Sequence, residues 1–335
     1  MKDYNVRCNL CPHNCVISDG GVGVCGVRRN EEGRLVTLIY GLITSIAIDP
    51  IEKKPLFHFY PGAPILSVST VGCNFKCLWC QNWHISQARP GSVYAEYLEP
   101  ADLVDLMKRH KVPFLAFTYN EPIIWYEYLI DVAKLAKREG MFIVLVTNGY
   151  VSKEPLLELV KYIDAANIDV KAFNEETYLK YIGGKLAAVL QAVETMHEKR
   201  IHVETTYLVI PELNDGEEEF GKMVKWHLEK LGPDVPLHIS RFYPAFRFLD
   251  RSPTPIETLN KLYSIARRAG INYVYVGNMP GHKGEHTFCP SCGRAVIRRM
   301  GFEILEWNLT RDNKCKYCGT PISITGSKWT GNLSV

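Results

Sequence analysis

The amino-acid sequence predicts an α/β fold, a partial (β/α)6-type TIM barrel with small Cys-rich appendages at its N- and C-terminal ends. Three observations support this prediction. Short runs rich in β-branched residues recur between residues 65 and 277. An amphipathic, charge-bearing segment separates each run from the next. All 11 cysteines fall into three clusters, two of which lie outside this alternating region.

The runs and the segments between them give the expected elements in chain order. The expected strands are residues 65–72, 114–118, 141–147, 165–171, 202–210, 236–242 and 273–277. The expected helices are residues 100–110, 122–138, 153–162, 174–198, 215–231 and 254–269. This alternation indicates βα units, a parallel sheet and right-handed crossovers. Six or seven units favour a barrel over an open sheet, and barrels carry their chemistry at the carboxyl ends of the strands.

The ends of the chain are expected to form separate small units. Residues 1–64 are interpreted as a metal-binding segment with four cysteines and a β-rich lead-in, residues 65–280 as the barrel, and residues 281–335 as a zinc-ribbon-like module. The 39 basic and 36 acidic residues are interspersed and leave a formal net charge of +3, which favours neither nucleic acid nor membrane as a partner. No run approaches the roughly 18 apolar residues of a membrane span, and the first residues do not resemble a signal peptide. We therefore expect a cytoplasmic protein whose cysteines bind metal.

The central cysteines stand in the stretch VGCNFKCLWCQNWHISQ, residues 71–87, directly after the first expected strand. Cys73, Cys77 and Cys80 have the spacing C-x3-C-x2-C. A structural zinc ion takes four ligands, and a 4Fe–4S cluster for electron transfer takes four thiolates. One interpretation is a zinc site completed by His84. The other is a 4Fe–4S cluster with one iron free of protein ligands, and such an open position is where chemistry occurs.

This spacing, with an aromatic residue just before the last cysteine, resembles the signature of the radical S-adenosylmethionine (SAM) superfamily. The resemblance implies that Cys73, Cys77 and Cys80 are the catalytic cluster ligands and that the free iron binds the methionine part of SAM. An electron from the cluster would cleave SAM into methionine and a 5′-deoxyadenosyl radical, which abstracts hydrogen from a substrate. Trp79 would lie against the adenine, and Gln81 is a further expected cofactor contact.

Polar side chains directly after the next three expected strands are the other candidate SAM contacts. These are Asn120 and Glu121 in TYNEP, Asn148 in VTNGY, and Asp169 and Lys171 in DVK. The TYNEP stretch is similar to a Gly-Gly-Glu-Pro-like stretch of the superfamily, in which an acidic residue holds the amino group of SAM. The DVK stretch resembles the Asp-Leu-Lys of glycyl-radical activating enzymes. Further pocket candidates on the fifth and sixth strands are His202, Glu204, His238 and Arg241.

Read along nearly its full length, the chain resembles the radical SAM component of the AmmeMemoRadiSam system, close to the pyruvate formate-lyase activating-enzyme branch. The stretches that carry this resemblance are CNLCPHNC, GVCGVRRN, DPIEKKPLFHFYPG, the central cysteine motif, TYNEP, VTNGY, LVIPELND and YVGNMPG. It implies AMMECR-type and Memo-type companion proteins and a low-potential electron donor of ferredoxin or flavodoxin type. The substrate stays open between a protein or peptide and a small metabolite. A non-catalytic electron-transfer or metal-binding protein is the remaining alternative.

The two flanking cysteine groups predict further metal sites. Cys289, Cys292, Cys315 and Cys318 form two C-x2-C pairs with the spacing of a zinc ribbon. Cys8, Cys11, Cys15 and Cys25 contain a single C-x2-C pair, so their spacing favours zinc only narrowly over an auxiliary 4Fe–4S cluster.

A protein or peptide substrate is favoured by the two appendages, which could cover the barrel mouth or grip a large partner. Segment 50–62, PIEKKPLFHFYPG, mixes lysines with aromatic residues, a composition expected of an interaction surface. The alternative for this segment is a half-buried β-hairpin with a charged turn.

Overall fold

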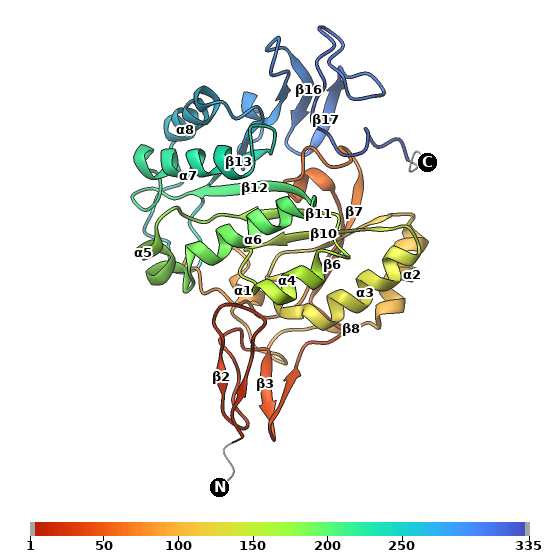
Figure 1. Ribbon diagram of the computed structural model, residues 1–335, viewed down its shortest axis with the longest axis vertical. Coiled ribbons are helices and arrows are strands. Elements are labelled where there is room, and N and C mark those ends of the chain that lie inside the picture. Colours follow the sequence, from red (N-terminus) through yellow and green to blue (C-terminus); the bar gives the residue numbers. More distant parts are fainter. Residues whose placement is uncertain (1–3, 332–335) are drawn as a thin grey trace.

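The computed structural model describes residues 4–331, and its centre is an eight-stranded sheet (Figure 1). The sheet order is β14-β13-β12-β11-β10-β9-β7-β6. The strands are β6 (Ser45–Pro50), β7 (Pro64–Ser69), β9 (Phe114–Phe117), β10 (Phe142–Thr147), β11 (Ala165–Asp169), β12 (His202–Val209), β13 (Leu237–Arg241) and β14 (Val274–Gly277). β7 and the six strands from β9 to β14 run parallel, while β6 pairs antiparallel with β7. The sequence-based expectation of a parallel α/β fold is confirmed.

Helices connect the parallel strands in the expected places. They are α2 (Pro100–His110), the 3-10 turn η2 (Pro122–Trp125) leading into α3 (Tyr126–Arg138), α4 (Lys153–Leu159), α5 (Glu175–Thr177) with the π-helical turn η3 (Tyr178–Ile182), α6 (Leu186–Glu198), α7 (Glu217–Lys230) and α8 (Ile256–Ala269). Helix α3 shows why they form, because Leu129, Val132, Ala133 and Ala136 recur at helical spacing and are all buried. Each large aliphatic side chain buried in this way contributes roughly 1.5–3 kcal/mol. Within the described residues no helix is both long and apolar enough to cross a membrane.

The expected helix over residues 174–198 is interrupted, and the interruption shapes the loop beside it. Gly183 has a left-handed φ of 82°, and α6 begins only at Leu186. A Cβ atom on Gly184 would lie 2.2 Å from the ring of Phe75. Because only glycine permits so close an approach, Gly184 forms a seat for the loop that carries the central cysteines.

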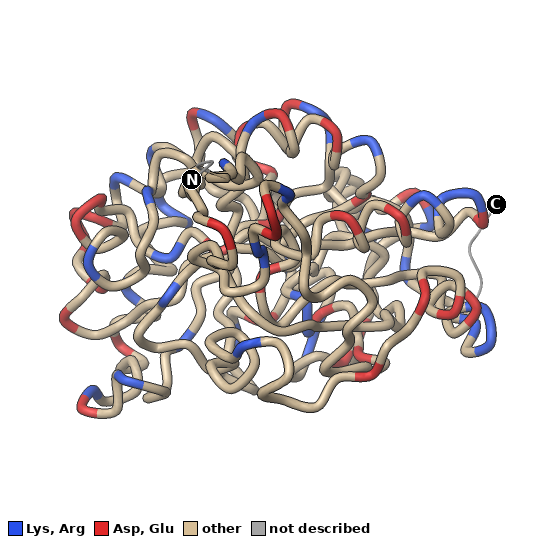
Figure 2. The backbone as a smooth tube through the Cα atoms, turned by 90° about the horizontal axis from the view of Figure 1, so that it is seen from below, with Lys and Arg blue, Asp and Glu red and all other residues tan. Residues whose placement is uncertain are grey.

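The remaining elements form two small units at opposite ends of the molecule (Figure 1). The N-terminal unit has β1 (Val6–Arg7), β2 (Val16–Ile17), β3 (Arg28–Glu31) and β4 (Arg34–Thr37), and the C-terminal unit has η4 (Lys283–Glu285), β15 (Thr287–Phe288), β16 (Ala295–Met300) and β17 (Glu303–Trp307). Short elements between them are β5 (Leu42–Ile43), η1 (Ile51–Lys53), α1 (Trp83–Ser86) and β8 (Glu96–Tyr97). Figure 2 shows acidic and basic residues interspersed along the chain.

The two end units contact opposite ends of the parallel strands. The amide of Ser152, which follows β10, donates to the carbonyl of Leu10 in the N-terminal unit at 3.0 Å. In contrast, the ring of His202, the first residue of β12, is 2.9 Å from the hydroxyl of Thr325. The N-terminal unit therefore lies at the carboxyl ends of the strands and the C-terminal unit at their amino ends. Of the two roles expected for the appendages, covering the barrel mouth is wrong for the C-terminal one, whereas gripping a large partner stays a prediction.

Segment 50–62, between β6 and β7, is buried inside the partial barrel. Phe57 and Phe59 are 7% and 1% exposed. Asn167, in the middle of β11, donates to the carbonyl of Pro55 at 2.8 Å, which ties the segment to the inner face of the sheet. The expectation that this segment forms an interaction surface is wrong, because its aromatic residues fill the interior of the barrel.

A buried arginine joins the C-terminal unit to this segment. Arg299 of β16 is 1% exposed and donates to the carbonyl of Phe57 at 3.0 Å and to the hydroxyl of Thr287 at 2.9 Å. Its guanidinium lies 4.4 Å from the centre of the Phe57 ring, and its Nε is 3.7 Å from the buried carboxylate of Glu52. A buried guanidinium with these partners holds the C-terminal unit in one orientation relative to segment 50–62.

We predict that His58 makes the stability of the protein pH-dependent. This fully buried side chain donates from Nδ1 to the Ser323 carbonyl and accepts at Nε2 from the Tyr275 hydroxyl, and burial lowers its pKa from 6.5 to about 4. The unfolded chain takes up a proton below about pH 6.5 and the folded chain only near pH 4, so the contribution of His58 is complete above pH 6.5 and is lost as the pH falls. Between about pH 7.5 and 5.5 the free energy of unfolding should fall by about 1 kcal/mol through this group.

Urea unfolding under anaerobic conditions at the two pH values measures this contribution. His58→Phe should unfold more easily at both pH values but with a smaller difference between them, whereas the exposed His110→Phe should behave as the unaltered protein. An unchanged pH difference in His58→Phe would contradict the prediction.

Candidate active site

The three central cysteines lie on a loop that crosses the carboxyl ends of the strands. The loop is fixed by backbone contacts to the turn after α5, where the amide of Lys76 donates to the carbonyl of Ile182 at 2.8 Å and that of Leu78 to Tyr181 at 3.3 Å. The side chain of Asn74 donates to the carbonyl of Tyr150, after β10, at 2.8 Å. These contacts to distant segments hold the thiols in place before any cofactor binds.

One cavity, enclosing ≈ 1280 Å³ including the solvent at its mouth, lies beneath this loop. Every residue that the sequence analysis placed in the cluster and SAM site lines it: Cys73, Cys77, Cys80, Trp79, Gln81, Asn120, Glu121, Asn148, Asp169 and Lys171. They come from the ends of β7, β9, β10 and β11, which are neighbours in the sheet. Parallel pairing therefore brings together side chains that are nearly 100 residues apart in the sequence.

The spacing of the three thiols fits an iron–sulfur cluster better than a single zinc ion. A tetrahedral zinc ion with Zn–S bonds of about 2.3 Å holds its sulfur atoms about 3.8 Å apart. Cys73, Cys77 and Cys80 are not such a compact set, since within residues 4–331 only the C-terminal cysteines bring their ligand atoms within 4.8 Å of one another. His84, the alternative zinc ligand, is exposed and does not line the cavity. Three thiols around a larger space leave room for a 4Fe–4S cluster.

Polar groups already point at two of the thiols. The amide of Phe75 and the side-chain nitrogen of Asn148 lie 3.4 and 3.8 Å from the sulfur of Cys73, and the hydroxyl of Ser86 lies 3.1 Å from that of Cys80. Such donors stabilise the negative charge of thiolate ligands and adjust the potential of a cluster.

Glu121 is held by donors from its own chain. Its buried carboxylate accepts from the Thr147 hydroxyl at 2.7 Å, the Asn148 amide at 2.8 Å and the Ile123 amide at 3.0 Å. Burial raises its pKa to about 7 despite these bonds. The structure thus gives Glu121 a positioning role that the sequence did not predict, because it ties the end of β9 to the end of β10.

The side chain of Asn120 also bonds to neighbouring backbone groups of the protein. Its side-chain nitrogen donates to the carbonyl of Gly72 at 2.8 Å, and its oxygen is 3.2 Å from the amide of Thr70. Asn120 therefore braces the strand that leads into the cysteine loop.

Lys171 and Asp169 keep polar groups available to a ligand. The Lys171 ammonium is 2.8 Å from one oxygen of the Asp169 carboxylate. Burial by itself disfavours the charged ammonium, but this carboxylate raises the pKa of Lys171 above its ordinary value. The ammonium therefore stays charged. Because it has three N–H donors, it can bond to Asp169 and also donate to an anionic group in the cavity.

Several cavity residues were missed by the sequence analysis. Tyr119 has a left-handed φ of 70°, unusual for a bulky residue, at the position where the superfamily pattern has glycine. Its hydroxyl donates to Asp49 at 2.6 Å, and the same carboxylate is 2.8 and 2.7 Å from the ammonium groups of Lys53 and Lys54. The signal in the sequence was the Tyr in place of Gly, because such a replacement needs a partner that fixes the side chain. Tyr119, Lys53 and Lys54 line the cavity, and Asp49 holds all three side chains from behind.

The other pocket candidates lie outside this cavity. Glu204 is fully buried near the amino end of β12, where it accepts from His238 at 2.6 Å and from the amide of His58 at 2.7 Å, with His202 at 3.1 Å. Arg241 donates to the carbonyl of Thr254 at 2.9 Å. These residues therefore join the sheet to segment 50–62 and to the segment before α8, and the hypothesis that they line the pocket is wrong.

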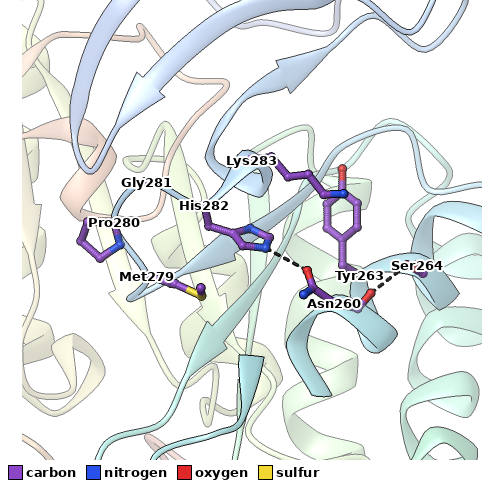
Figure 3. Close-up of a pocket in the computed structure, with 8 residues that line it drawn as sticks. All are labelled: Asn260, Tyr263, Ser264, Met279, Pro280, Gly281, His282 and Lys283. Carbon is purple, nitrogen blue, oxygen red and sulfur yellow. Dashed lines mark hydrogen bonds between the residues drawn. The ribbon is translucent and has the colours of Figure 1, made fainter. Parts of the chain in front are cut away.

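A second hollow lies between α8 and the segment after β14 (Figure 3). His282 points into it, with Nε2 2.9 Å from the side-chain oxygen of Asn260, as the figure shows, and Nδ1 accepting from the amide of Gly284 at 2.9 Å. No cysteine or carboxylate is among its lining residues, so this hollow lacks ligands for a cluster.

The C-terminal cysteines form the compact set that the central ones do not. The sulfur atoms of Cys289 and Cys318 are 3.6 Å apart and those of Cys292 and Cys315 are 3.8 Å apart. These separations match the edges of a tetrahedral zinc–thiolate site, about 3.8 Å.

Comparison with known proteins places the site in a family. The model of the Radical SAM superfamily matches residues 67–226. An uncharacterized protein of Methanocaldococcus jannaschii, MJ0808, is 43% identical over 97% of each chain. The pyruvate formate-lyase 1-activating enzyme of Escherichia coli strain K12 is 26% identical over 44% of this chain and 61% of its own length, so the chain spans about three fifths of that enzyme. A radical SAM methyltransferase from Sphaerobacter thermophilus shares the fold, with a TM-score of 0.50, 16% identity and coverage of 68% of this chain and 71% of that one.

The chain belongs to the radical SAM superfamily and is an enzyme of that class, with homology to glycyl-radical and pyruvate formate-lyase activating enzymes. The family implies a 4Fe–4S cluster and SAM as cofactors. The finer assignment to the AmmeMemoRadiSam system stays a prediction.

We predict that Glu121→Ala loosens the wall of the cavity. The substitution leaves the Thr147 hydroxyl and the amides of Ile123 and Asn148 without their acceptor, at a cost of roughly 1–3 kcal/mol for a buried donor left unpaired. Hydrogen exchange of the Asn148 amide should accelerate and the unfolding temperature should fall.

The exposed Glu198→Ala is the matched control and should change neither quantity. Native-like protection of the Asn148 amide in Glu121→Ala would show that Glu121 does not tie the two strands together.

Proposed function

We propose that the chain binds a 4Fe–4S cluster through Cys73, Cys77 and Cys80, cleaves SAM reductively and abstracts hydrogen from a residue of a protein or peptide. The observation that carries the proposal is the single cavity that all three thiols share with the polar ends of β9, β10 and β11. Three cysteines line this cavity, so a cluster held there keeps one iron for a ligand other than protein. When bound, the cluster supplies one electron that breaks the C5′–S bond of SAM, giving methionine and a 5′-deoxyadenosyl radical.

In this proposal, different side chains of the cavity bind different parts of SAM. The Lys171 ammonium is placed to donate to the SAM carboxylate or ribose, a charge-assisted contact of roughly 1.5–3 kcal/mol. Asp169 keeps that ammonium oriented, at 2.8 Å. Trp79, 3% exposed, offers an aromatic wall for the adenine. Glu121 acts through the backbone that it positions, and the spare capacity of its carboxylate can accept from the SAM ammonium.

A protein or peptide substrate is supported by the relatives and by the N-terminal unit. The homologous activating enzymes are named for their action on other enzymes. The N-terminal unit lies at the carboxyl ends of the strands, where the cavity is, and provides surface for a large partner. AMMECR-type and Memo-type proteins are the candidate partners, and the electron comes from a ferredoxin- or flavodoxin-type donor.

We further propose zinc at Cys289, Cys292, Cys315 and Cys318, with a structural role, since Cys289 and Cys315 are buried in the contact between the C-terminal unit and the barrel. The chain would act in the reducing cytoplasm, consistent with 11 free cysteines.

Deuterium transfer tests the class of substrate. Cells of the source organism grown in deuterated medium supply an extract, which ultrafiltration separates into macromolecules and small molecules. The reduced enzyme with unlabelled SAM should form deuterated 5′-deoxyadenosine only with the macromolecular fraction, because the radical takes its hydrogen from the substrate.

Protease treatment of that fraction before the assay should remove the label, whereas nuclease treatment should leave it unchanged. Deuterium arriving from the small-molecule fraction alone would show that the substrate is a metabolite and overturn this part of the proposal.

A further inference from the structure

The four N-terminal cysteines line one hollow, but their sulfur atoms do not converge into a compact set. Cys8, Cys11, Cys15 and Cys25 all line one small hollow, which reaches ≈ 330 Å³ only when the open solvent beside it is counted. No three of their sulfur atoms lie within 4.8 Å of one another in the part of the chain that the structure describes, 4–331. In this respect they resemble the central cysteines and differ from the C-terminal set.

The N-terminal thiols are spaced more widely than four thiolates on a single zinc ion. Four thiolates on one zinc ion stand about 3.8 Å apart and leave no cavity between them. The same chain shows such spacing at its C-terminal cysteines, with sulfur separations of 3.6 and 3.8 Å. Thiols that stand farther apart than this are expected of ligands to the larger core of a 4Fe–4S cluster.

A buried arginine supplies a second, independent indication of a bound group. Arg28 lines the hollow, is 5% exposed, and is fixed by two bonds to Glu127 at 2.8 and 2.6 Å. Its Nε has no hydrogen-bond partner among the described residues. A buried N–H left without an acceptor costs roughly 1–3 kcal/mol, and four thiolates on a 4Fe–4S core form an anion that accepts it.

This hollow lies against the loop that carries the three active-site cysteines. Asn74, next to Cys73 in sequence, lines it, and the backbone carbonyl of Asn74 is 2.8 Å from Nε2 of His13. A Cβ atom on Gly72 would lie 2.9 Å from the carbonyl of Cys25, so the two cysteine loops are in direct backbone contact. A redox group in the N-terminal hollow would therefore lie against the loop that holds the active-site cluster.

We propose that Cys8, Cys11, Cys15 and Cys25 bind a second 4Fe–4S cluster, which accepts single electrons from a low-potential one-electron donor and passes each of them to the active-site cluster. The destination of the electron rests on the proposed function, whereas the identity of the metal does not. The structure thus favours the iron–sulfur interpretation of these cysteines over the zinc interpretation that their spacing narrowly favoured.

Metal analysis of one variant tests the cluster without reference to activity. The variant with Cys73, Cys77 and Cys80 all changed to Ala is purified anaerobically and reconstituted with iron and sulfide. It should retain about four iron atoms per chain, and the unaltered chain about eight. When reduced, the variant should show the EPR signal of one reduced cluster.

The matched control adds Cys8→Ala and Cys11→Ala to that variant and should lose the remaining iron while keeping the zinc of the C-terminal set, which shows that the chain is folded. An iron-free triple variant, with zinc or nothing at the N-terminal cysteines, would overturn the proposal, as would about four iron atoms in the unaltered chain. Loss of SAM cleavage in the triple variant bears on the proposed function alone.

The relay is tested with Cys8→Ser/Cys11→Ser and two reductants. A flavodoxin-type protein must pass electrons through the N-terminal cluster, whereas dithionite is small enough to reach the active site directly. The ratio of flavodoxin-driven to dithionite-driven formation of 5′-deoxyadenosine should fall at least about tenfold in the variant. An unchanged ratio would show that the second cluster does not carry the electrons.

Discussion

The candidate active site depends on holding three thiols rigidly on one loop, and the cluster that we propose there would leave one coordination position open. A loop with three metal ligands cannot rely on a fourth to close it, so other parts of the chain must fix its shape. Three contacts fix the shape of this loop. The ring of Phe75 packs against Gly184, the amide of Lys76 donates to the carbonyl of Ile182, and Gly72 contacts the backbone of Cys25. The helix interruption and the N-terminal unit are therefore parts of the same support.

The two ends of the barrel have different tasks. At the amino ends of the strands, segment 50–62 fills the interior and Arg299 ties it to the C-terminal unit. At the carboxyl ends, the N-terminal unit lies against the cysteine loop and brings a second thiol-lined hollow to it. Exclusion of water at one end, and the electron transfer that we propose at the other, would both serve a radical that must meet its substrate and nothing else.

The sequence predicted the seven parallel strands, most helices and ten of the residues that line the cavity, because local periodicity and the parallel sheet rule decide where strand ends meet. It failed where a distant contact decides the outcome. Nothing local shows that Phe75 interrupts a helix at Gly184 or that Asp49 holds Tyr119 in a left-handed turn. The sequence likewise predicted Glu121 as a SAM ligand, because nothing local shows that Thr147 and Asn148 donate to its carboxylate. Cysteine spacing alone does not give the separation of the sulfur atoms, which was needed to distinguish zinc from a cluster.

The central claim is that the three thiols of one loop make this chain a generator of 5′-deoxyadenosyl radicals. The most direct measurement incubates the anaerobically reconstituted full chain with SAM and dithionite and quantifies both products. The account predicts 5′-deoxyadenosine and methionine in equal amounts, and neither product from Cys77→Ala. A protein with its full iron content that binds SAM and yet forms no 5′-deoxyadenosine would contradict it.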